Sequence, residues 1–241
     1  MLAVQPQANY DYYVSGITLL IAGSVQQSIN QQKEDVTMAD PKYFVITVAK
    51  CDPTYVPTAM EQVGSVIDDL KSKAGALVVR AGIIATGEQT GSLGLFQAYE
   101  GLDGFEKALD IYAASSDYAA MMASGKVSVV MRNIVKMHSV PFDHNTSETP
   151  KFIVLTRSSA PASSVETVTQ LAPIFADNSA LTLMFGTIVT GSNAGNQLLG
   201  VTYPSMDAIE KTYDALRADT NYQAALADFN INLRAIVRVL M

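Results

Sequence analysis

The chain has 241 residues, of which 49% are hydrophobic and 16% charged, so it can bury a sizeable core and does not have the composition of a disordered protein. Its formal net charge of -7 argues against nucleic acids and acidic membrane surfaces as partners, because both require a basic patch. The single cysteine, Cys51, excludes an intrachain disulfide, and its place at the end of an apolar run indicates a buried, inert thiol.

The most apolar stretch near the start, residues 12–25, is too short and too polar to span a bilayer. It also makes a poor signal peptide, because no basic residue precedes it and the first one is Lys33. We therefore expect a cytoplasmic protein.

Residues 1–41 precede the first predicted strand and have two interpretations. The codons for Lys33-Glu-Asp can spell a bacterial ribosome-binding sequence just ahead of Met38, which favours a natural start there and a translated leader before it. The alternative is a genuine arm that docks on a neighbouring molecule through residues 10–25. The sequence favours neither.

Six elements are predicted next, in the order β-α-β-β-α-β of the ferredoxin-like unit. Runs of β-branched and aromatic residues predict the strands, and apolar side chains at helical spacing predict the two helices. The strands are expected at residues 42–51, 77–86, 92–99 and 127–137, and the helices at 56–70 and 102–112.

The same order is predicted again in the second half of the chain. Its strands are expected at residues 151–157, 181–190, 197–203 and 231–240, with one helix after the first strand and another over 206–216. We therefore expect an N-terminal segment (1–41), a first repeat (42–140), a linker (141–150) and a second repeat (151–241).

The two halves also match residue by residue. Sliding the chain by 104 positions superimposes residues 82–123 on the second half without a gap, so that Gly82 and Thr86 fall on Gly186 and Thr190. A repeat of fixed period indicates a duplicated supersecondary unit. Two such units can pack as an internal pseudo-dimer.

Two repeated segments resemble a known superfamily. Each third strand ends in a tyrosine, Tyr99 or Tyr203, and each second helix is followed by a Ser/Asp-x-x-Tyr element, Ser115–Tyr118 or Asp219–Tyr222. This combination is similar to the dimeric α/β-barrel superfamily, which includes antibiotic-biosynthesis monooxygenases, muconolactone isomerases, stress-responsive barrel proteins and haem-handling enzymes. The resemblance implies an α+β fold of two tandem ferredoxin-like repeats packed as an intrachain α/β barrel.

The resemblance also implies a class of function. It suggests a protein that binds a small apolar molecule, and a cofactor-independent oxygenase or isomerase as its activity. The alternative is a non-catalytic binding or assembly scaffold. It is favoured by the near-symmetry of the repeats and by the small number of histidines, two in the whole chain. Whether the protein is an enzyme, and whether it forms a homo-oligomer, both stay open.

No cofactor is expected. The haem enzymes of the superfamily use an axial histidine in the second repeat and their haem-degrading relatives rely on a tryptophan, whereas this second repeat has no histidine and the chain has no tryptophan. His138 and His144 lie at the junction of the repeats and could ligate a metal together with Asp143 and Glu148, but their spacing matches no standard metal site, and no metal is expected.

Several polar residues are candidates for contact with a ligand in a pocket between a sheet and its helices. Arginines in the middle of a buried strand need an acidic partner or a bound anion, and tyrosines can present a hydroxyl group to a pocket. The competing interpretation is that the tyrosines pack the sheet on the helices and the arginines pair internally. The candidates are Tyr99, Arg132, His138, Arg80, Tyr203 and Arg234; no catalytic residue is assigned.

Arg132 and Arg234 occupy matching positions in the last strand of each repeat. The strand of Arg132 runs on to His138, whereas that of Arg234 ends at the last residue of the chain. We therefore expect Arg132 to face a cavity and Arg234 to be structural.

Overall fold

The computed structural model describes residues 41–159 and 164–241, and these residues belong to one compact unit. Both interpretations of the first 37 residues, as a leader or as an arm, lie outside the described residues. Along the described ranges, no helix is long and apolar enough to cross a membrane.

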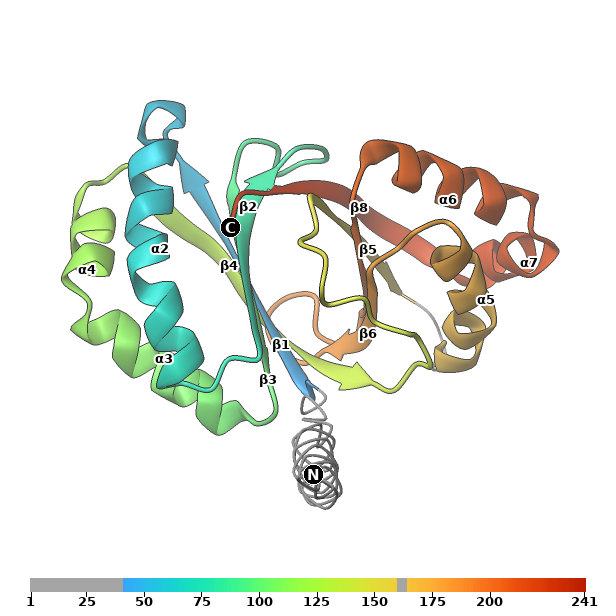
Figure 1. Cartoon of the computed structure of the whole chain (residues 1–241), viewed down its shortest axis with the longest axis horizontal. Coiled ribbons are helices and arrows are strands. Elements are labelled where there is room, and N and C mark those ends of the chain that lie inside the picture. Colours follow the sequence, from blue (N-terminus) through green and yellow to red (C-terminus); the bar gives the residue numbers. More distant parts are fainter. Residues whose placement is uncertain (1–40, 160–163) are drawn as a thin grey trace, which may run out of the picture. The chain divides into compact units, whose positions relative to one another are not determined.

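Eight antiparallel strands form a closed barrel in the order β1-β3-β2-β8-β5-β7-β6-β4 (Figure 1). The first repeat comprises β1 (Tyr43–Cys51), a 3-10 turn η1 (Pro53–Tyr55), α2 (Val56–Ser72), β2 (Val78–Ile84), β3 (Leu93–Tyr99), α3 (Leu102–Ala114), α4 (Ser116–Ala123) and β4 (Val127–His138). The second comprises β5 (Phe152–Ser159), α5 (Val165–Asp177), β6 (Thr182–Ile188), β7 (Gln197–Tyr203), α6 (Met206–Ala218), α7 (Thr220–Asp228) and β8 (Asn230–Val239). The predicted fold, two ferredoxin-like repeats packed as an intrachain α/β barrel, is confirmed.

Each repeat contains one short helix that the sequence predicts only as a Ser/Asp-x-x-Tyr element. The Ser115 side chain accepts a hydrogen bond from the backbone N–H of Tyr118, and Asp219 does the same for Tyr222. Such bonds satisfy a free N–H group in the first turn of a helix. The repeated element is therefore the start of a helix, α4 or α7, with the tyrosine in its first turn.

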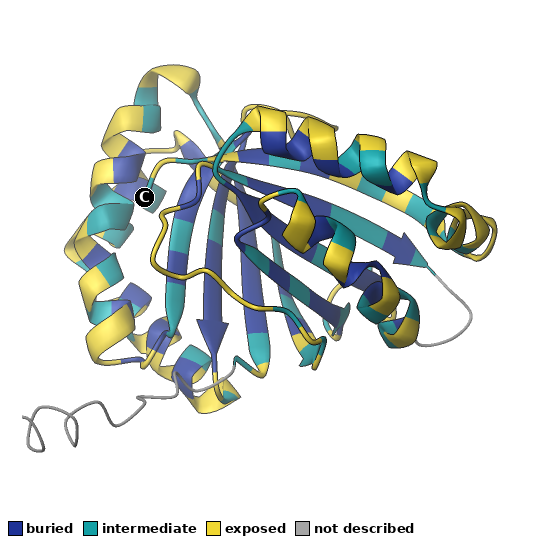
Figure 2. Cartoon of the chain, turned by 45° about the vertical axis from the view of Figure 1, so that its right-hand side comes forward, coloured by how far each residue is buried: buried dark blue, intermediate teal, exposed yellow. Residues whose placement is uncertain are grey.

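The strands are apolar on both faces because both faces are covered. One face of every sheet points into the barrel, where Ile46, Phe96 and Val237 belong to a shared core. The opposite face packs against α2 and α3 in the first repeat and against α5 and α6 in the second. Figure 2 shows the result: buried residues run along the strands, and the helices turn exposed faces to solvent.

Two seams, the strand pairs β2–β8 and β4–β6, join the repeats and close the barrel. Strand β2 corresponds to β6 at a shift of 104 residues and β4 to β8 at a shift of 102, and a glycine stands at the same place in each seam. Gly82 pairs with Val239 across the first seam, and Gly186 pairs with Met137 across the second. A Cβ atom on Gly82 would lie 2.2 Å from the Arg238 carbonyl oxygen, and one on Gly186 would lie 2.5 Å from that of Lys136.

A threonine hydrogen bond extends each seam into the next turn. The Thr86 hydroxyl accepts from the backbone N–H of Ile236 at 2.9 Å, and the Thr190 hydroxyl accepts from that of Ile134 at 2.9 Å. Each threonine therefore satisfies a backbone group of the other repeat. The duplicated glycine and threonine are explained by closure of the barrel.

We predict that Gly82→Ala and Gly186→Ala each destabilise the protein by about 1–3 kcal/mol, because the added methyl group meets backbone atoms that cannot rotate away. Thermal unfolding followed by circular dichroism measures this loss. Gly200→Ala in β7 is the matched control, since the nearest atom to its Cβ would be a Leu155 methyl group at 3.7 Å. Losses no greater than that of the control would show that the seam glycines are not required.

Candidate functional site

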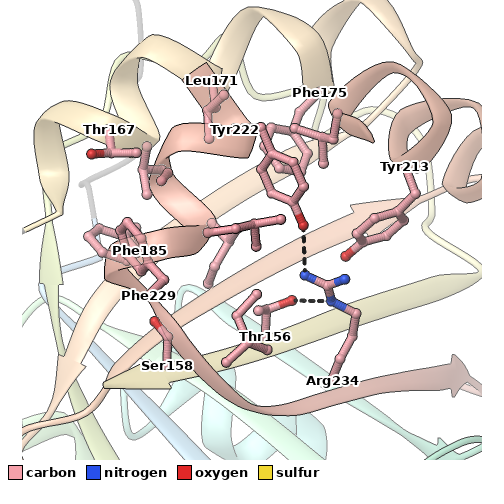
Figure 3. Close-up of a pocket in the computed structure, with 16 residues that line it drawn as sticks. Thr156, Ser158, Thr167, Leu171, Phe175, Phe185, Tyr213, Tyr222, Phe229 and Arg234 are labelled. Carbon is pink, nitrogen blue, oxygen red and sulfur yellow. Dashed lines mark hydrogen bonds between the residues drawn. The ribbon is translucent and has the colours of Figure 1, made fainter. Parts of the chain in front are cut away.

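The larger of two matching pockets lies in the second repeat, between the outer face of the sheet and helices α5, α6 and α7 (Figure 3). Its volume is about 70 Å³. Apolar side chains such as Leu171, Phe175 and Phe185 form most of its wall. The complete lining is Thr156, Ser158, Thr167, Val168, Leu171, Phe175, Phe185, Leu199, Tyr213, Leu216, Tyr222, Ala225, Leu226, Phe229, Ile231 and Arg234.

Polar groups gather at one end of this pocket, around Arg234 of β8. Its Nε donates to the hydroxyl oxygen of Thr156 at 3.3 Å, and its Nη2 donates to the hydroxyl oxygen of Tyr222 at 3.2 Å. The guanidinium carbon lies 4.6 Å from the centre of the Tyr213 ring, a cation–π distance. Figure 3 shows the three partners converging on the guanidinium from β5, α6 and α7.

The pocket contains a positive charge without a carboxylate beside it. Its described lining has no Asp or Glu, and none of the ion pairs among the described residues includes Arg234. The guanidinium is also exposed rather than buried. The expectation of an internal acidic partner is therefore wrong for this arginine: hydroxyl groups and an aromatic ring hold it.

The Tyr213 side chain is partly buried beside this charge. Burial raises the pKa of its phenol, while the positive charge of Arg234 and a hydrogen bond with Thr156 lower it again. Because the net direction is upward, the phenol stays protonated at neutral pH.

A smaller pocket of about 50 Å³ occupies the matching place in the first repeat. There Arg132 Nε donates to the hydroxyl oxygen of Thr47 at 3.0 Å, and its guanidinium carbon lies 5.4 Å from the centre of the Tyr112 ring. Tyr118, the equivalent of Tyr222, also lines this pocket. Both repeats thus present a threonine, an arginine and a tyrosine from corresponding elements.

Two substitutions between the repeats open space in the second pocket, whereas Phe185, in place of Ala81, and Tyr213, in place of Leu109, add bulk there. Met121 of the first repeat corresponds to Ala225, and Tyr112 corresponds to Leu216. The Tyr112 hydroxyl donates to Gln97 Oε1 at 2.9 Å, which fixes the ring over its pocket. Gln97 in turn corresponds to Val201, so the second repeat has neither the tyrosine nor its acceptor.

Four of the sequence-predicted candidates lie outside both pockets. Tyr99 and Tyr203 are buried between sheet and helix, and burial raises the pKa of both phenols. Arg80 Nη1 donates to the Val79 carbonyl oxygen, and His138 Nε2 lies 2.8 Å from the Thr187 hydroxyl. The two tyrosines thus pack the sheet on the helices, as the competing interpretation has it.

The other two candidates, Arg132 and Arg234, each line a pocket. The expected asymmetry, a cavity beside Arg132 and a structural Arg234, is not found, since both face a cavity and that of Arg234 is larger. The sequence analysis missed Tyr112, Tyr213 and the two threonines, because their approach to the arginines depends on strand register and helix orientation.

Two further groups give no sign of chemistry. Within the described ranges, no cluster of three or more His, Cys, Asp or Glu side chains is placed to hold a metal ion. Cys51 is half-buried rather than fully buried, and burial raises the pKa of its thiol, which keeps it in the unreactive protonated form.

We predict energetic coupling between Gln97 and Tyr112. Gln97 Oε1 accepts from the hydroxyl groups of Tyr99 and Tyr112 at 2.6 and 2.9 Å, all within the core. Gln97→Leu and Tyr112→Phe each remove the hydrogen bond between these two residues. The sum of their losses in unfolding free energy should therefore exceed the loss in the double variant by about 1 kcal/mol. Denaturant unfolding of the four proteins measures this coupling; strictly additive losses would contradict it.

Solved structures share the fold at low sequence identity. A candidate monooxygenase from Fusobacterium nucleatum has a TM-score of 0.59 at 12% identity, over 83% of this chain and 94% of that chain. A mutant of chlorite dismutase from Candidatus Nitrospira defluvii has a TM-score of 0.56 at 6% identity, over 84% of this chain and 92% of that chain. A haem-binding protein from Thermus thermophilus has a TM-score of 0.51 at 10% identity, over 84% of this chain and 95% of that chain. The chain thus has the dimeric α/β-barrel fold in its tandem-repeat form.

No curated protein matches the chain. One family model matches it twice, over residues 41–137 and 150–239, which correspond closely to the two β-α-β-β-α-β units. The chain therefore belongs to the family described as "Domain of unknown function (DUF6854)".

Proposed function

We propose that the protein binds a small, mainly apolar molecule in the pocket of the second repeat. The observation that carries this proposal is the composition of the pocket: mainly apolar walls with Arg234, Thr156 and Tyr222 hydrogen-bonded together at one end, and the hydroxyl groups of Ser158 and Thr167 away from them (Figure 3). Binding sites for small molecules typically combine an apolar lining with a few polar groups that orient the ligand.

The size of the pocket limits the ligand. Its volume of about 70 Å³ is smaller than the roughly 150 Å³ of an engineered cavity that accepts benzene. Any ligand as large as benzene, including a six-carbon alcohol or carboxylate, therefore requires the wall to move. Helix α7 is the part of the wall best able to move, because none of its residues is fully buried.

A catalytic form of this proposal is a cofactor-independent oxygenase or isomerase of a small apolar substrate. The fold shared with candidate monooxygenases supports it. The described lining, however, offers no carboxylate or imidazole as a general base, and the raised pKa of Tyr213 makes its phenol a poor proton acceptor. Binding is therefore the better-supported part of the proposal.

Haem does not fit this pocket. Haem iron requires an axial ligand, most often histidine; the described lining contains no histidine, cysteine or methionine, and its two tyrosines contact Arg234. His138, on the adjoining strand β4, lies against Thr187 and Phe185 instead. A macrocycle is also far larger than the enclosed volume. The haem binding of proteins with this fold is therefore not transferred to this chain.

The alternative is a non-catalytic scaffold. It is favoured by the arginine, threonine and tyrosine that recur in both repeats, since a duplicated arrangement can serve packing alone. The unequal volumes of the pockets, about 70 and 50 Å³, favour ligand binding instead, because the two repeats differ in the residues that line them.

We predict that Ala225→Met weakens binding of an apolar probe, 1-hexanol, at least tenfold, because it introduces the side chain that narrows the first pocket. The shift of the unfolding temperature with probe concentration measures the affinity. Native mass spectrometry of the purified protein reports any retained ligand in the same variants.

Ala224→Met is the matched control, since Ala224 is an exposed residue of the same helix and does not line the pocket. Equal binding by both variants and the unchanged protein would contradict the proposed site. So would the absence of both probe binding and retained ligand.

A further inference from the structure

We infer that the ligand of the second pocket is a monoanion: an apolar body with a carboxylate or similar oxyanion that Arg234 and Tyr222 bind together. This inference rests on the proposed function and specifies the chemical class of its ligand. Three features of the polar end of the pocket support it, namely its charge, its hydrogen-bond donors and its rigidity.

The first feature is the positive charge. Within the described lining, Arg234 is the one ionised side chain at neutral pH, since Tyr213 keeps its proton and no carboxylate is present. Arg234 is exposed, so water also reaches this charge, but an anionic ligand pairs with it directly. A neutral ligand gains only an ion–dipole contact.

The second feature is an excess of donors over acceptors. Two of the five N–H groups of the Arg234 guanidinium are used by Thr156 and Tyr222 within the described structure. Because the Tyr222 oxygen accepts from Nη2, the hydrogen of its own hydroxyl group is available for a ligand. A neighbouring N–H and O–H are two donors, and a carboxylate supplies two acceptors in bidentate geometry.

The third feature is the fixed position of the guanidinium. Thr156 holds Nε, Tyr222 holds Nη2, and the Tyr213 ring lies against the planar group, as Figure 3 shows. A side chain that is already ordered loses less conformational entropy when the ligand binds.

The first repeat has the charge but not the hydrogen bond between arginine and tyrosine. Arg132 is held by Thr47 but has no hydrogen bond to Tyr118 among the described contacts, and its aromatic neighbour Tyr112 donates its hydroxyl hydrogen to Gln97. Arg132 therefore provides a matched control, an arginine in the same position without this tyrosine contact.

The experiment compares hexanoate with 1-hexanol, which share an alkyl chain and differ in charge. Calorimetric titration at constant ionic strength should show hexanoate binding at least tenfold more tightly to the unchanged protein. Arg234→Gln should abolish this preference and leave 1-hexanol binding within about twofold, whereas Arg132→Gln should retain the preference.

Two further variants test the geometry. Tyr222→Phe should weaken hexanoate binding severalfold without changing 1-hexanol binding, because only the donated hydroxyl hydrogen and the contact with Arg234 are lost. Arg234→Lys should retain part of the preference, since the charge remains and the planar fork does not.

The outcomes separate this inference from the proposed function. Equal binding of hexanoate and 1-hexanol would overturn the anion assignment and leave the apolar pocket in place. Loss of the preference in Arg132→Gln, but not in Arg234→Gln, would also overturn it. Failure of both probes to bind, together with no retained ligand, would instead remove the proposed function on which the inference rests.

Discussion

Close backbone approach at the two seams is the constraint on which the rest of the structure depends. Each four-stranded sheet has edges that must be paired or covered, and the partner repeat pairs them through β2–β8 and β4–β6. The approach is possible because Gly82 and Gly186 have no Cβ. The seams also position the site: Thr86 of the first repeat binds the N–H of Ile236, two residues beyond Arg234 on β8. The pocket of one repeat is thus supported by the other, so neither repeat is an independent binding unit.

The repeats have kept what closes the barrel and changed what fills the pockets. Glycine and threonine are retained at both seams, and an arginine lies next to a threonine on the adjacent strand in both repeats. The differences accompany one another: where the first repeat has Gln97 and Tyr112 joined by a buried hydrogen bond, the second has Val201 and Leu216. A buried phenol without its acceptor would lose the free energy of an unmade hydrogen bond, so exchange of both residues together is the less costly route to an open pocket. The exchange of Gln97 and Tyr112 for Val201 and Leu216 is therefore a coordinated change in the packing around the second pocket.

The sequence alone predicts the fold because its signals are local or periodic. Strands such as Gln197–Tyr203 stand out by their β-branched and aromatic residues, and the duplication removes most doubt about their order. The site is less predictable, because it depends on contacts between distant residues. Tyr213 lies on the apolar side of α6, where a sequence pattern indicates only packing, and its contact with Arg234 requires knowledge of how α6 crosses the sheet. Tyr203 shows the opposite error: a duplicated tyrosine at the end of a strand suggests a pocket, but the side chain is fully buried.

The position of Tyr222 connects ligand binding to helix α7. Its backbone N–H is the group that Asp219 caps at the start of the helix, while its hydroxyl group contacts Arg234. One residue thus joins the first turn of α7 to the polar end of the pocket. Because α7 has no fully buried residue, its attachment to the sheet depends on a few contacts of this kind. A ligand that binds Arg234 and Tyr222 together, as we propose, would add to those contacts and stabilise the position that the helix has in this structure. The same residue would then contact the ligand and hold the wall of the pocket in place.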